Sequence, residues 1–87
     1  MKKLPVLLTD IAQYMHVSVR DIRGKSKRQP LPDARHLFVY VAKQYKISGV
    51  MATTYINKAH SLTKHVRFKS QNDYEFMALI KEFQCNK

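Results

Sequence analysis

The sequence predicts an all-α fold, a small bundle of about five to six helices. Apolar residues recur at the spacing of a helix surface along most of the 87-residue chain, and no stretch alternates as a half-buried strand does. Only two glycines and three prolines interrupt this pattern. A chain of this length supports one core, so we interpret residues 1–87 as a single domain.

The first half of the chain predicts three helices. The first begins at Leu4-Pro5, because proline is tolerated in a first helical turn. A short second helix follows Ser18, whose hydroxyl can cap it, and ends at Gly24. The third and longest helix starts at Asp33 and ends near Tyr45. The apolar stripes expected to face the core are Leu7, Leu8, Ile11, Ala12 and Met15 in the first helix and Ala34, Leu37, Phe38, Val41 and Ala42 in the third.

The second half predicts three more helices. Ser48 is placed to cap a short helix, which ends in a turn at Ile56-Asn57-Lys58. The next helix begins at Ala59 or His60. A turn at Ser70-Gln71-Asn72 then leads to a C-terminal helix over about residues 72–84. The first of these helices carries the apolar residues Val50, Met51 and Tyr55, and the second carries Leu62, Val66 and Phe68. In the C-terminal helix we expect four residues to face inward: Tyr74, Met77, Ile80 and Phe83.

The charge of the chain is strongly positive and unevenly distributed. The net charge is +10, and residues 34–72 contain seven Lys or Arg and no acidic residue. Charge imbalance of this size is self-repulsive, so it indicates a polyanionic partner, most often nucleic acid. The alternative is a basic surface that serves solubility alone, but solubility does not require that acids be absent from one contiguous half.

The most basic part of the chain has the layout of a helix-turn-helix over about residues 48–68. In that motif the second helix enters the major groove and its first residues reach base edges. A helical hairpin with a solvated polar face has the same layout, and the charge distribution favours DNA binding. A basic loop over residues 24–32 would supply further contacts. The candidate DNA-binding residues are Lys25, Lys27, Arg28, Arg35, Lys43, Asn57, Lys58, His60, Ser61, Thr63, Lys64, His65 and Arg67.

Residues 24–44 carry a family resemblance. The run GKSKRQPLPDARHLFVYVAKQ resembles the C-terminal DNA-binding domain, domain IV, of the bacterial replication initiator DnaA, in which a basic loop leads into an AR-(Q/H)-x-x-x-Y-x-A-(K/R) helix. Residues 11–22 are similar to the opening of that domain, and residues 57–65 to its recognition signature RDH-(S/T)-T-V-x-H. The resemblance covers roughly residues 6–83.

The resemblance implies a Trp-repressor-like helical fold and a replication-related or regulatory DNA-binding role. It implies that His60, Ser61 and His65 contact bases or phosphates, and that Lys27 or Arg28 enters the minor groove, where narrow geometry concentrates negative potential. In the same family the positions of Arg35 and Lys43 would bind the DNA backbone.

The chain departs from that signature at several positions. The family's acidic residue, which can accept from a cytosine amino group, is Ala59 here, and a family threonine is Leu62. Two usually apolar positions are Thr63 and Lys64. We therefore expect the chain to recognise poorly the DNA sequence that the initiator domain normally binds. The initiator's ATPase is absent as well, since the chain has no GxxxxGK(S/T) stretch.

The residues favour neither catalysis nor a metal. His60 and His65 would lie on different faces of a helix, the other histidines fall in separate elements, and the single cysteine, Cys85, cannot complete a zinc site. No nucleophile is patterned with a base, so we expect no enzyme and no cofactor. The apolar runs are too short to cross a bilayer, and one cysteine fits a cytoplasmic protein. Met1 and the amphipathic ends are typical of a complete small protein.

The alternative function is a protein-interaction adaptor that keeps an initiator-like fold, has lost base-specific readout and binds an acidic protein partner. An exposed apolar patch at Val50 and Met51 would favour it. RNA binding ranks last, because no aromatic platform on a sheet is predicted. The oligomeric state stays open, since no heptad repeat enforces a dimer.

Overall fold

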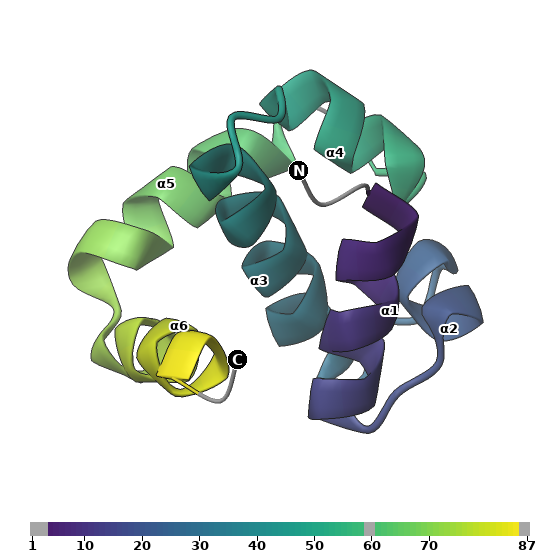
Figure 1. Cartoon of the computed structure of the whole chain (residues 1–87), viewed down its shortest axis with the longest axis horizontal. Helices are drawn as coiled ribbons and strands as arrows, with labels where there is room; N and C mark the ends of the chain where they lie inside the picture. Colours follow the sequence, from purple (N-terminus) through teal and green to yellow (C-terminus); the bar gives the residue numbers. More distant parts are fainter. Residues whose placement is uncertain (1–3, 59–60, 86–87) are drawn as a thin grey trace.

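The computed structural model describes residues 4–58 and 61–85, except for the side chains of residues 69 and 70. The secondary structure of these residues consists of six helices joined by loops and turns, with no strand, which confirms the predicted all-α class (Figure 1). The described part measures 30 × 26 × 25 Å. The helices are α1 (Leu4–Met15), α2 (Val19–Arg23), α3 (Leu31–Gln44), α4 (Gly49–Tyr55), α5 (Leu62–Asn72) and α6 (Tyr74–Cys85).

Helix α3 is the centre of the fold, with α1 on one side and α5 on the other (Figure 1). Helices α2, α4 and α6 also contact it. A helix surrounded in this way buries most of its circumference, so Val39 is as inaccessible as Leu37 and Phe38 although it lies outside the predicted stripe. The predicted stripe itself is confirmed, because all of its members are buried: Ala34, Leu37, Phe38, Val41 and Ala42.

Side-chain caps begin three of the helices. The hydroxyl oxygen of Ser18 accepts a hydrogen bond from the backbone N–H of Asp21 at 3.0 Å, and that of Ser48 accepts from Val50 at 3.1 Å, so both predicted caps are confirmed. The third cap is Asp73, whose carboxylate accepts from the backbone N–H of Phe76 at 3.1 Å. Each cap satisfies an N–H group that the helix itself leaves unpaired.

The junction between α5 and α6 corrects the predicted turn at residues 70–72. Helix α5 continues to Asn72, and Asp73 is the single non-helical residue before α6. Residues 70–72 contain neither glycine nor proline, so nothing in them forces the helix to stop. The break occurs one residue later because the Asp73 side chain caps the next helix.

The buried face of α6 agrees with the prediction at Ile80 and Phe83 and differs from it at the start of the helix. Phe76, Ile80 and Phe83 face the core, at a helical spacing of four and three. Tyr74, expected to face inward, is 85% exposed, and Met77 is only half-buried. On α5, Val66 is buried as expected, whereas Phe68 is 67% exposed. None of the described helices is long and apolar enough to span a membrane.

Helices α1, α3 and α4 end in the same turn, each with a left-handed residue that is not glycine. His16, Lys46 and Asn57 have φ values of 59°, 63° and 59°. In each case the next residue donates its backbone N–H to a carbonyl five positions back, the bond of a Schellman motif. These bonds are Val17 to Ala12 at 2.9 Å, Ile47 to Ala42 at 3.0 Å and Lys58 to Thr53 at 2.8 Å.

The variant Lys46→Gly is expected to raise the free energy of unfolding by about 0.5–1 kcal/mol, because glycine adopts a positive φ without Cβ strain. Urea denaturation measures this change. Lys43 is equally exposed but lies inside α3, so Lys43→Gly should lower the same free energy by about 1 kcal/mol. A Lys46→Gly variant less stable than the parent chain would contradict the expectation.

Candidate nucleic-acid interface

A basic groove lies where three segments distant in the sequence meet. The basic loop after α2, the first two turns of α3, Lys58 and the first turn of α5 enclose an open hollow of 460 Å³. Its lining combines two apolar residues, Pro32 and Leu62, with cationic and imidazole side chains. We call this hollow the basic groove; its lining residues are Lys27, Pro32, Arg35, His36, Lys58, Leu62 and His65.

Arg35 lies at the inner wall of the groove and is 5% exposed. Its Nε donates to the carbonyl oxygen of Ile22 at 2.8 Å, and its Nη2 donates to those of Asp21 and Gly24 at 3.0 and 3.1 Å. These carbonyls terminate α2, where a helix has no internal donors left and its dipole favours a cation. Arg35 thus caps α2, which corrects its expected position on an outward face as a DNA-backbone contact.

Lys58 adds a second cation to the same helix end. Its Nζ donates to the carbonyl oxygen of Gly24, and the side chain is half-buried. Burial lowers the pKa of the Lys58 ammonium, and the charges of Arg35 and Lys27 lower it further. Three cations therefore converge at the end of α2, a concentration of positive potential that an anion would relieve.

The segment after α4 is also fastened to α2. Arg23 donates from Nε to the carbonyl oxygen of Tyr55 at 3.0 Å, and its guanidinium lies 5.3 Å from the centre of the Tyr55 ring. The amide of Asn57 donates back to the carbonyl oxygen of Arg23 at 3.4 Å. These contacts hold the end of α4 and the residues directly after it, Asn57 and Lys58, against the end of α2.

The close contact between α4 and α5 depends on Gly49 and Thr63. The Thr63 hydroxyl is fully buried and has no hydrogen-bond partner within the described part of the chain. A Cβ on Gly49 would lie 2.9 Å from both Oγ1 and Cγ2 of Thr63. The Thr63 side chain therefore faces α4, which corrects its expected contact with DNA.

The remaining predicted residues are dispersed around the groove. Lys43 and Arg67 line a separate hollow of 190 Å³ between α3 and α5, together with Tyr40 and Val66. His60 lies outside the described residues, as does Ala59. The other predicted residues are exposed on the basic loop, after α4 and on α5: Lys25, Lys27, Arg28, Asn57, Ser61, Lys64 and His65.

His36 is a groove residue that the sequence-based prediction did not include. It lines the basic groove, and its ring packs edge-on against Phe76, with centroids 6.2 Å apart. The signal for it is positional: His36 follows Pro32 by one helical turn, so the two share a face of α3. Within the described chain, no three His, Cys, Asp or Glu side chains gather where they could hold a metal ion.

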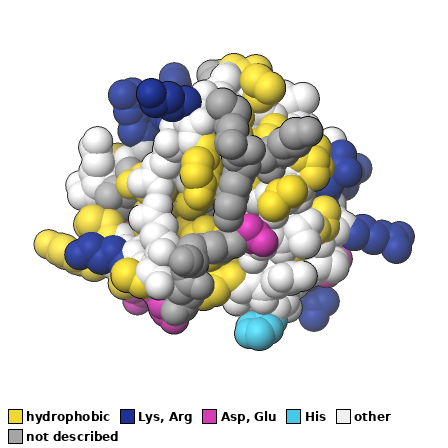
Figure 2. All heavy atoms as spheres, in the orientation of Figure 1, with side chains coloured by type: hydrophobic (Ala, Val, Ile, Leu, Met, Phe, Trp, Pro, Cys, Tyr) yellow, Lys and Arg dark blue, Asp and Glu magenta, His cyan; other side chains and the backbone are white. Residues whose placement is uncertain are grey.

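The face of the molecule seen in Figure 1 is not a continuous basic surface. Figure 2 shows Lys and Arg side chains along its outline, while hydrophobic side chains and an acidic one occupy its centre. The basic groove instead gathers cations where loop, α3 and α5 meet. The fold therefore brings some of the cations together in the basic groove, while others lie apart along the outline of the face in Figure 2.

Comparisons with protein-family models, curated proteins and solved structures found no match to this chain. The similarity of residues 6–83 to the initiator domain therefore rests on the motifs in the sequence, and it stays a prediction.

Replacing Arg35 with Met is expected to lower the free energy of unfolding by about 2–4 kcal/mol, because three carbonyls lose a charged donor. Arg35→Lys should recover only part of this loss, since an ammonium lacks the planar fork of a guanidinium. Chemical denaturation measures both. Lys43→Met, an exposed change on the same helix, should stay within about 0.5 kcal/mol of the parent; an equal loss for both Met variants would refute the capping role.

Gly49→Ala is expected to lower the free energy of unfolding by about 1–3 kcal/mol, because the added Cβ collides with a stiff β-branched side chain. Thr63→Ala removes both colliding atoms. In that background Gly49→Ala should cost less than about 0.5 kcal/mol, and a double-mutant cycle measures the coupling. Equal costs in the two backgrounds would mean that the contact does not limit the approach of α4 to α5.

Proposed function

We propose that this chain binds double-stranded DNA, with α4 and α5 acting as a helix-turn-helix and the basic loop lying against the adjacent backbone or minor groove. The observation that carries the proposal is the basic groove, to which separate segments contribute Lys27, Lys58, His36 and His65. Phosphate oxygens are the natural ligands for such donors, and their neutralisation supplies most of the affinity for DNA.

The positions of the exposed cations support the placement of α5 in the major groove with the basic loop beside it. Lys64 and His65 are exposed in the first turns of α5, and Lys25, Lys27 and Arg28 are exposed on the loop. A helix inserted by its N-terminal end would have cations on both sides, one set from its own turns and one from the loop. Helices α4 and α5 contact each other, and both contact α3.

We expect the affinity to come mainly from the DNA backbone. Leu62 is half-buried in the groove and cannot replace the hydrogen bond of a polar side chain. The chain also has Ala59 at the position where the initiator domain has an acidic residue that can accept from a cytosine amino group. Each missing base contact removes about 1–3 kcal/mol of discrimination. The role that fits is a replication-related or regulatory module without an ATPase.

A salt titration of binding to a pool of random duplexes tests the proposal. With about 6–8 phosphate contacts, the logarithm of the binding constant should fall by about 5–7 per tenfold rise in salt. Lys27→Ala and Lys64→Ala should each reduce that slope by about 1, since each removes one phosphate contact. Lys81→Ala, on the exposed side of α6, is the matched control and should leave it unchanged.

The outcome also reports specificity. An enriched motif among the bound duplexes would indicate direct base readout, whereas a steep slope without a motif would indicate backbone binding alone. A slope near zero would exclude DNA as the partner.

One observation favours the second candidate, an adaptor for an acidic protein. Val50 and Met51 are 51% and 59% exposed on α4, which forms the apolar patch that this function requires. The double variant Val50→Ser, Met51→Ser distinguishes the two functions. A DNA-binding chain should keep its affinity for duplex, whereas an adaptor should lose its protein partner.

A further inference from the structure

The junction of α5 and α6 carries the two most exposed large hydrophobic side chains of the described chain. Phe68 is 67% exposed and Tyr74 is 85% exposed. Together with Asn72, Asp73 and Glu75 they line an open hollow of 620 Å³. We call these five residues the acidic corner.

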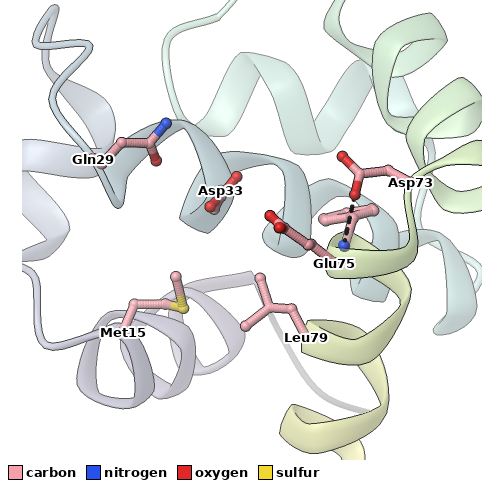
Figure 3. A pocket seen from close by; sticks show the side chains of 7 residues that line it. Met15, Gln29, Asp33, Asp73, Glu75 and Leu79 are labelled. Carbon is pink, nitrogen blue, oxygen red and sulfur yellow. Dashed lines mark hydrogen bonds between the residues drawn. The ribbon is translucent and has the colours of Figure 1, made fainter.

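A second hollow, of 360 Å³, shares Asp73 and Glu75 with the acidic corner and adds Asp33. Figure 3 shows the carboxylates of Asp33 and Glu75 pointing toward one another from the starts of α3 and α6. Three of the chain's six acidic residues therefore lie on one side of a molecule of net charge +10. The residues that line the two hollows include no Lys or Arg.

This combination of groups recognises the cationic side chains of proteins. Carboxylates form charge-assisted hydrogen bonds with guanidinium and ammonium groups, and exposed aromatic rings stack with guanidinium. The core does not need the two rings, because Phe76, Ile80 and Phe83 already anchor α6. Adjacent exposed aromatic residues of this kind are typical of a surface that meets a partner.

The acidic corner lies at the opposite end of α5 from the basic groove. Leu62 begins the helix in the groove, and Asn72 ends it in the corner. Eleven helical residues separate these ends by about 16 Å. If the first turns of α5 enter the major groove, the acidic corner stays accessible on the bound protein.

We propose that the acidic corner docks on exposed cationic side chains of a second copy of this chain, bound beside the first on the same duplex. Exposed cations that do not line the basic groove are available for this contact: Arg20, Lys43 and Lys46. A contact between two different surfaces is heterologous and repeats from one copy to the next along the DNA.

Charge explains why the contact requires DNA. Two free copies of net charge +10 repel each other, whereas DNA phosphates neutralise both copies and hold them close together. A corner of this size forms a weak interface that needs a high local concentration. The inference therefore rests on the proposed DNA binding, and its consequence is cooperative binding to long duplexes.

Binding to two lengths of duplex tests the inference. The molecule is 30 Å long, which corresponds to about 9 base pairs, so a duplex of about 12 base pairs holds one copy and one of about 60 holds several. We expect the parent chain to bind next to an occupied position on the order of tenfold more tightly than to an isolated one. Tyr74→Ser and Glu75→Gln should each reduce this cooperativity and leave binding to the short duplex unchanged.

Val6→Ser is the matched control, because Val6 is 52% exposed on α1, away from the acidic corner. It should retain the full cooperativity. Cooperativity that is absent in the parent chain, or that persists in both corner variants, would overturn the inference and leave DNA binding standing. Failure of the parent chain to bind the short duplex would overturn the proposed function and this inference with it.

Discussion

The guanidinium of Arg35 joins the end of α2 to the central helix, and the local architecture depends on that joint. Helix α2 has five residues, far fewer than an isolated helix needs for stability in water. Its last carbonyls find donors on a neighbouring element, and Arg35 supplies three such hydrogen bonds. Because Arg35 of α3 holds the end of α2, the basic loop begins beside the first turns of α3.

The same helix end explains how Arg35, Lys58 and Lys27 can lie close together beside the basic groove. Lys58 and Asn57 donate to backbone carbonyls of Gly24 and Arg23, so the partial negative charge of a helix terminus partly offsets the repulsion. Burial still lowers the pKa of Lys58. Residues assigned to DNA contact from their charge therefore also have structural roles. Two residues that line the basic groove, Arg35 and Lys58, are held in place by hydrogen bonds to backbone carbonyls.

The sequence was sufficient for features that depend on local chemistry. Helix periodicity predicted the all-α class, and the hydroxyls at Ser18 and Ser48 predicted two helix starts, since a cap acts within three residues. It could not assign Arg35, because the carbonyls that this side chain caps lie 11 to 14 positions away. Thr63 was misassigned for a similar reason, since its orientation depends on how closely Gly49 lets α4 approach. The inward side of α6 was predicted correctly for Ile80 and Phe83 but not for Tyr74 and Phe76, because the surroundings of its first turn depend on how α6 packs beside the other helices.

The break at Asp73 has a consequence for the topology of the chain. One residue outside helical geometry decides whether the last part of the molecule folds back onto α3 or continues straight. Without it, residues 62–85 would form one rod about 36 Å long, and the apolar face of α6 would leave its own core. Such a rod would leave Phe76, Ile80 and Phe83 exposed, because these side chains are buried only where α6 lies beside the rest of the bundle. The Asp73 carboxylate caps α6 at the one position where the chain changes direction.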